Sequence, residues 1–204
     1  MKSILLATAL TLGASAASAA TIDFESFPHA LYLFEDGPVS FTDGFATITA
    51  VAPPTTSMEI APDVAGVGTS LWIYNESEDF DPTLAYPSVA KVSFARGVSS
   101  LSIELGDIAY DQDSIFLAIF DADDLPLGYI DFLRDIDSSD MVTLALSSGS
   151  RIAYALFGTN DYDLGAISVD NLTYEVATVP VPAGGLLLAS ALGLLGLKRR
   201  RRAA

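Results

Sequence analysis

A two-residue alternation of apolar and polar side chains constrains the fold of this chain more than any other feature. In residues 101–105, the leucine and isoleucine side chains point one way, while Ser102 and Glu104 point the other. This is the period of a half-buried β-strand. Before the C-terminal tail, no window of about a dozen residues shows a strong helical stripe. The alternation predicts strands at residues 21–25, 39–42, 45–51, 57–60, 70–74, 91–94, 99–105, 114–120, 127–133, 141–146, 152–157 and 166–175.

Turn-forming residues separate these segments, as at Asp36-Gly37-Pro38, Asp43-Gly44 and Ser148-Gly149. Glycine adopts positive φ without steric cost, and the aspartate side chain bonds to its own backbone nearby, so both favour turns. Many short strands spaced by such turns are typical of a two-layered antiparallel sheet. We therefore predict an all-β fold, an antiparallel β-sandwich.

The first 19 residues have the three parts of a secretory signal. Lys2 supplies the positive charge, residues 4–12 form the apolar segment, and Ala17-Ser18-Ala19 forms an A-x-A cleavage site. The apolar segment is too short for a membrane span. We therefore predict that residues 1–19 are a signal peptide and that Ala20 begins the exported chain.

The C-terminal tail, residues 179–204, also has three parts. It opens with an extended, proline-containing motif, which is Val179, Pro180, Val181, Pro182 and Ala183. Prolines fix φ and lack an amide donor, so this motif cannot lie inside a helix. A small and apolar run to Leu197 follows, which is short for a membrane span. The last part is a basic membrane stop made of Lys198, Arg199, Arg200, Arg201 and Arg202.

This order of motif, apolar segment and arginines resembles the PEP-CTERM sorting signals, in their VPLPA-CTERM variant, with Val181 where that variant has leucine. The resemblance implies a precursor anchored in the inner membrane of a Gram-negative-type bacterium. It further implies processing by an exosortase-like enzyme and delivery to the cell surface or beyond. A permanent C-terminal anchor is the alternative. The resemblance implies nothing about the chemistry of the domain before the tail.

The segment between the two signals, residues 20–178, has the length of one domain with its own core. It contains no cysteine, so disulfides and thiolate metal sites are excluded. It carries all 26 acidic residues of the chain against four basic ones. We expect such a surface to repel nucleic acid and anionic polysaccharide at low salt and to favour divalent cations.

No set of residues in this domain predicts catalysis. His29 is the only histidine and stands beside Pro28, where we expect a surface loop, and no G-x-S-x-G motif is present. One histidine and no cysteine exclude the usual zinc sites. A glycosidase-type pair of carboxylates stays open among so many acids, although no particular pair stands out. We expect the domain not to be an enzyme.

The last predicted strand contains a change of phase. Ile167 and Val169 alternate on one parity, whereas Leu172 and Tyr174 continue on the other, which indicates a β-bulge at Asp170-Asn171. Here the domain resembles exported jelly-roll modules, including carbohydrate-binding ones. In these modules a final V-x-D-N strand lies near a first strand that ends in glutamate.

The resemblance implies a structural Ca²⁺ ion between the two strands. Glu25 and Asp170 would be its side-chain ligands, with further oxygens near Asp43. A solvated Glu25 and an Asp170 that only caps a turn are the competing interpretation.

Three aromatic residues are candidates for stacking on a sugar ring: Trp72, Tyr110 and Tyr162. A position in the core is the competing interpretation for Trp72, because apolar residues flank it on both sides.

Taken together, the sequence predicts first a non-enzymatic surface or extracellular-matrix protein. The alternative is a carbohydrate-binding module acting on extracellular polysaccharide, and a glycosidase-type enzyme is the third hypothesis.

Overall fold

The computed structural model describes residues 19–32, 44–51, 56–61, 68–75, 88–106, 114–133, 141–160 and 167–177. All regular structure in these ranges is β-strand, and every strand pair is antiparallel. The strands are β1 (Ala19–Ile22), β2 (Ala30–Tyr32), β3 (Ala46–Ala50), β4 (Thr56–Ala61), β5 (Ser70–Asn75), β6 (Val89–Gly106), β7 (Ser114–Phe120), β8 (Pro126–Leu133), β9 (Val142–Thr159) and β10 (Ile167–Val176).

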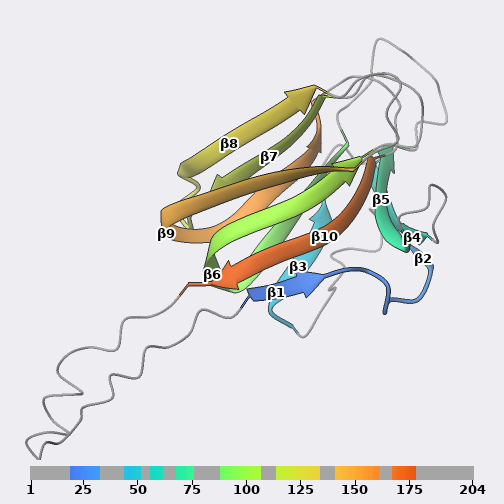
Figure 1. Ribbon diagram of the computed structural model, residues 1–204, viewed down its shortest axis with the longest axis horizontal. Helices are drawn as coiled ribbons and strands as arrows, with labels where there is room; N and C mark the ends of the chain where they lie inside the picture. The colour runs from blue at the N-terminus through green and yellow to red at the C-terminus, as the bar shows by residue number, and fades with distance from the viewer. Residues whose placement is uncertain are drawn as a thin grey trace, which may run out of the picture.

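The strands form one sheet in the order β2-β4-β5-β10-β6-β9-β7-β8, with β1 paired to β10 and β3 paired to β6. The long strands β6 and β9 pair with each other twice, and their register shifts between Ser93 and Val98. Near its start, β6 also pairs with β3, whereas its later half pairs with β10. The two long strands therefore pass from one layer of a sandwich to the other (Figure 1).

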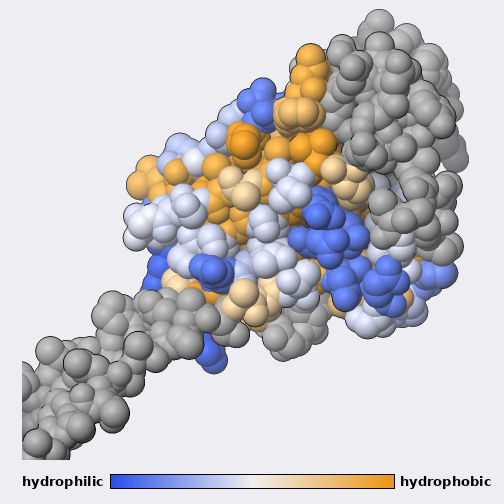
Figure 2. All heavy atoms as spheres, viewed as in Figure 1, coloured by the Kyte–Doolittle hydropathy of each residue, from blue (hydrophilic) through white to orange (hydrophobic). Residues whose placement is uncertain are grey.

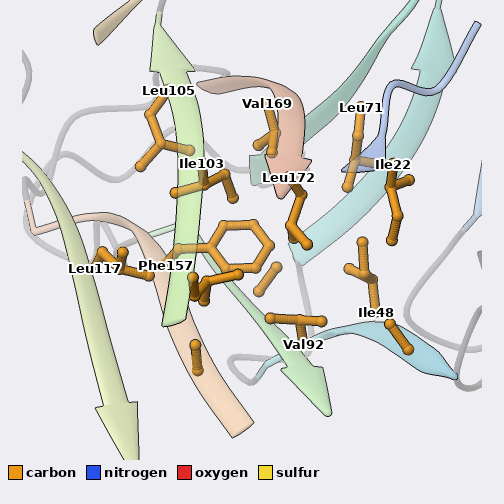
Figure 3. Close-up of a cluster of buried hydrophobic side chains, with 14 of the residues drawn as sticks. Ile22, Ile48, Leu71, Val92, Ile103, Leu105, Leu117, Phe157, Val169 and Leu172 are labelled. Atoms are coloured by element: carbon orange, nitrogen blue, oxygen red, sulfur yellow. The ribbon is translucent and has the colours of Figure 1, made fainter. Parts of the chain in front are cut away.

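A continuous core fills the space between the layers. Figure 3 shows Ile103 and Leu105 of β6, Val169 and Leu172 of β10, and Phe157 of β9 pointing toward a common centre. Each is fully buried, and burying one such side chain stabilises the fold by about 1.5–3 kcal/mol. This apolar core holds together a domain that has no disulfide.

The predicted strands that lie within the described residues are confirmed in type, and several differ in extent. Segments 91–94 and 99–105 join in β6, and 141–146 and 152–157 join in β9. The strand β2 was not predicted, and segment 39–42 lies outside the described residues. The first strand ends at Ile22, not at Glu25, because Phe24 has a φ of 58° and turns its fully buried side chain into the core.

The bulge predicted in the last strand is confirmed. Register with β6 shifts between Asp170 and Thr173, and Asn171 has a φ of 45°. Val169 and Leu172, on either side of the bulge, are both fully buried. The extra residue therefore brings apolar side chains of both parities to the core, as the phase change indicates.

The predicted signal peptide, apart from Ala19, and the predicted tail at 179–204 lie outside the described residues. Within the described ranges, no helix is long and apolar enough to cross a membrane.

Candidate functional site

The two faces of β7 differ in their role. Ile115, Leu117 and Ile119 are fully buried in the core. Phe116 and Phe120 alternate with them and therefore point away from the core, onto the outer surface of the sheet. Register pairs Ala118 of β7 with Tyr129 of β8 and Phe120 with Tyr154 of β9, so their side chains share this outer surface. We call Phe116, Phe120, Tyr129 and Tyr154 the aromatic face.

The first ring pair of the aromatic face joins β7 and β8. Tyr129 stacks on Phe116 with ring centroids 6.1 Å apart and an interplanar angle of 21°. Tyr129 is 56% exposed, whereas Phe116 beneath it is nearly buried. The Asn160 side chain donates a 2.9 Å hydrogen bond from Nδ2 to the Tyr129 hydroxyl. An exposed ring is thus supported by a second ring and fixed at its polar end.

The second ring pair joins β7 and β9. Phe120 and Tyr154 stack with centroids 4.9 Å apart and an angle of 8°. The Lys91 ammonium of β6 lies 4.0 Å from the Tyr154 ring centroid, which is a cation–π contact. The Tyr154 hydroxyl donates a 2.9 Å hydrogen bond to Asp124 Oδ1. Burial, this hydrogen bond and the charges of Asp124 and Asp121 raise the pKa of Tyr154, so its phenol remains a neutral donor.

Hydrogen-bonding side chains border these rings. Asp131 of β8 is the register partner of Phe116, and Ser93 of β6 is the register partner of Tyr154. Thr47 of β3 is in turn the register partner of Ser93, one strand further from the rings. In the space-filling view, apolar residues gather over β7 and β8 (Figure 2). The aromatic face therefore combines apolar ring surfaces with carboxylate, hydroxyl, amide and ammonium groups at their edges.

The sugar-stacking candidates chosen from the sequence do not form this face. Trp72 lies on β5 as the register partner of Ser168 and Glu59. It is half-buried, and its Nε1 donates a 3.0 Å hydrogen bond to Ser70 Oγ. Tyr110 and Tyr162 lie outside the described residues.

Sequence reasoning missed the four rings of the aromatic face. Segment 114–120 is apolar on both parities, so Phe116 and Phe120 are indistinguishable from core residues by pattern alone. The missing information is register, which places Tyr129 and Tyr154 from two other strands beside them. One sequence pattern could have indicated such a face: a predicted strand that is apolar on both faces, next to predicted strands that contain tyrosine.

The bulge in β10 buries a carboxylate. Asp170 is 6% exposed, and its Oδ1 accepts a 2.7 Å hydrogen bond from the Asn171 N–H. The Asn171 amide also donates to Asp170 Oδ2 at 3.2 Å and to Glu104 Oε2 at 2.8 Å. Burial raises the pKa of Asp170 to about 6, the Asn171 hydrogen bond opposes this, and the charges of Glu104, Glu25 and Asp23 add to it.

Glu25 and Asp170, the two predicted Ca²⁺ ligands that are described, thus lie close enough for their charges to interact. Glu25 Oε1 also accepts a 2.9 Å hydrogen bond from the Thr69 N–H. Asp43 lies outside the described residues. Within the described ranges, no group of three or more acidic or histidine side chains is arranged to hold a metal ion. The buried, acid-surrounded Asp170 fits the oxygen chemistry that Ca²⁺ requires, and the Ca²⁺ ion stays a prediction.

His29 is exposed, as expected for a surface loop.

Comparison with known proteins gives structural likeness only. No protein-family profile matches the sequence, and no curated protein matches it. Among solved structures, the chain is similar to a family 29 carbohydrate-binding module from Piromyces equi, with 7% identity and a TM-score of 0.48, covering 79% of this chain and 91% of that one. A mutant of the CBM29-2 module in complex with mannohexaose has 11% identity and a TM-score of 0.47, covering 79% and 94%. An arabinofuranosidase is matched over 25% of its length, with a TM-score of 0.43.

The order of the functional hypotheses needs a correction. The sequence placed a non-enzymatic surface or matrix protein first and a carbohydrate-binding module second. Three of these similar structures are carbohydrate-binding modules by name, and each match covers 79% of this chain. The first hypothesis is withdrawn as the role of the domain, and the case for the alternative rests on the side chains of the aromatic face.

Proposed function

We propose that the domain is a carbohydrate-binding module of jelly-roll type, and that it holds a polysaccharide chain across the aromatic face. The observation that carries the proposal is the presence of two stacked ring pairs, Phe116–Tyr129 and Phe120–Tyr154, on one outer sheet surface. Sugar rings present apolar C–H surfaces to aromatic rings and hydroxyls to polar side chains. The aromatic face offers both kinds of partner.

The spacing of the rings favours a chain over a single sugar. Phe116 and Phe120 are four residues apart on one strand, which corresponds to about 13 Å at roughly 3.3 Å per residue. Several consecutive sugar rings would span that distance. Ala118, which has a small side chain, lies midway between Phe116 and Phe120 on β7. Lys91 and Asp131 would supply hydrogen bonds along the way.

The domain acts by binding and not by catalysis in this proposal. Its carboxylates Asp124 and Asp131 serve as acceptors for sugar hydroxyls. A glycosidase would instead use two carboxylates on either side of a glycosidic bond. Release of reducing ends from any bound polysaccharide would identify an enzyme.

Delivery to the cell surface completes the proposal. It is supported by the sequence of residues 1–19, which has the form of a signal peptide, and by the sorting motif, apolar segment and basic end of residues 179–204. An exosortase-like enzyme is the partner that this tail would need, and the membrane would hold the precursor until processing.

The test is polysaccharide binding by the wild type and two matched variants. Tyr129→Ala removes the most exposed ring of the aromatic face. Phe132→Ala removes a ring that is 46% exposed on the same strand but points to the other face of the sheet. A stacking contact is worth about 0.5–1.5 kcal/mol beyond its buried area, so Tyr129→Ala should weaken binding by at least about twofold to tenfold.

Binding should be measured by affinity electrophoresis across neutral and acidic polysaccharides. Phe132→Ala should bind like the wild type. The proposal is refuted if no polysaccharide binds, or if both variants weaken binding equally.

A further inference from the structure

Two of the positive charges in the described ranges line the same groove. The lysines and arginines in the described ranges are Lys91, Arg96 and Arg151. Arg96 lies where β6 changes register and Arg151 lies at the corresponding part of β9. Both line one groove of about 450 Å³. Both side chains are exposed, and within the described part of the chain neither forms an ion pair.

The local backbone places Arg151 tightly against β6. Gly97 has a φ of 70°, and a Cβ atom built there would lie 3.4 Å from Arg151 Cβ and 3.2 Å from the Ile152 carbonyl oxygen. The absence of a side chain at Gly97 thus lets the base of Arg151 pack against the β6 backbone, one residue after Arg96. Two guanidinium groups carry five N–H donors each in a planar fork that matches a carboxylate.

The β7–β8 turn contributes acceptors to the same groove. Asp121 and Asp123 both line it. Asp121 Oδ1 accepts the N–H groups of Asp123 and Leu125 at 2.9 Å each, which fixes the turn. The groove therefore combines two guanidinium groups from β6 and β9 with two carboxylates from the turn.

One class of ligand satisfies both sets of groups. A neutral sugar would leave the arginines without an anion, and a simple inorganic anion would leave the two aspartates without a hydrogen-bond donor. A sugar that bears a carboxylate offers that anion to Arg96 and Arg151 and its hydroxyl hydrogens to Asp121 and Asp123. The groove also adjoins the aromatic face, since Asp121 follows Phe120 in the chain and Asp124, in the same turn, accepts the Tyr154 hydroxyl.

We propose that this groove binds a uronic acid residue of an acidic polysaccharide whose neighbouring sugars lie on the aromatic face. The inference rests on the proposed function and names its ligand class. It reverses the expectation that the acidic domain repels anionic polysaccharide. At about 0.15 M salt the Debye length is roughly 8 Å, so distant carboxylates are screened while a direct guanidinium–carboxylate contact persists.

The test compares uronate polymers with neutral forms of the same backbone. The probes are polygalacturonate, alginate and their carboxyl-reduced derivatives, measured at about 0.15 M salt with the purified protein. The variants are Arg96→Ala/Arg151→Ala and, as a charge-conserving control, Arg96→Lys/Arg151→Lys. Thermal melts of each variant establish that it is folded.

The wild type should bind at least one uronate polymer tenfold or more tightly than its reduced form. The alanine variant should lose this preference while keeping its binding to the reduced form, and the lysine variant should keep only part of the preference. A wild type that binds reduced and acidic forms equally, or an alanine variant that keeps the preference, overturns the inference alone. Binding to none of the probes or of the neutral polysaccharides overturns the proposed function as well.

Discussion

Replacing Asp170 by asparagine should stabilise the metal-free domain at neutral pH. Asp170 is buried at the bulge, and its pKa is about 6 in the folded state against a usual value of 3.8. Burial is the main cause, and all charged groups that add to the shift are acidic, namely Glu104, Glu25 and Asp23. The ionised form is therefore disfavoured in the folded domain relative to the unfolded chain.

The sign of the pH dependence follows from proton binding. Between pH 3.8 and about 6 the folded state binds more protons at Asp170 than the unfolded state, so the contribution of Asp170 to stability falls as pH rises. Below this window Asp170 contributes no penalty, and above it the penalty is complete. The shift of the Asp170 pKa from 3.8 to about 6 corresponds to about 1.4 kcal/mol per pH unit. Ionisation of Asp170 therefore lowers the free energy of unfolding by at most about 3 kcal/mol.

This destabilisation by the ionised Asp170 can be measured by urea unfolding of the wild type and Asp170→Asn in the presence of chelator at pH 4, 5, 6, 7 and 8. The two proteins should have similar stability at pH 4. Asp170→Asn should be more stable at pH 7 by up to about 3 kcal/mol, or up to roughly 6–12 °C in Tm for a domain of this size. Glu175→Gln, which changes an exposed carboxylate on the same strand, is the control and should follow the wild type.

The reasoning is refuted if the difference between wild type and Asp170→Asn is constant across this pH range, or if the variant is less stable at pH 7. Either result would mean that the Asp170 carboxylate is better solvated or better paired than its surroundings indicate.

Three further outcomes are expected. At pH 7, Ca²⁺ at a hundredfold its Kd should stabilise the wild type by about 2.7 kcal/mol, which thermal melts would show as a higher Tm. An unchanged Tm, or the same rise in Tm in Asp170→Asn, would contradict the Ca²⁺ prediction. Gly158→Ala should cost more than about 2 kcal/mol in chemical unfolding, because Gly158 has a φ of 150° and an added Cβ would overlap the Ser88 carbonyl. Gly149→Ala, with nothing within 4 Å, is its control and should be nearly neutral. Intact-mass measurement of surface-located protein should find residues 199–202 removed, and recovery of the complete basic tail would contradict processing.

The sequence was sufficient for features that depend on local alternation. The strands, the all-β class and the bulge at Asp170 follow from which parity is apolar, and the core residues Val169 and Leu172 confirm it. The continuity of β6 could not be predicted, because the register shift after Ser93 interrupts the alternation while the strand continues.

The candidate site could not be assembled from the sequence, for a different reason. The aromatic face unites side chains from β7, β8 and β9, and only cross-strand register brings Tyr129 and Tyr154 to the same surface as Phe116. The groove likewise depends on the turn after β7 standing beside the bends of β6 and β9. Trp72, chosen for its chemistry alone, lies on β5.

The pairing of β10 determines how the domain would resist mechanical load. Toward its end, β10 is hydrogen-bonded on one side to β1, through pairs such as Ala19 and Glu175, and on the other side to β6 (Figure 1). Antiparallel hydrogen bonds run perpendicular to the strands. A pull on the chain beyond Val176, directed along the strand axis, would shear many of these bonds at once and would not peel them apart singly. A domain tethered at this end while bound to a polymer would transmit tension through a strand that is hydrogen-bonded on both sides.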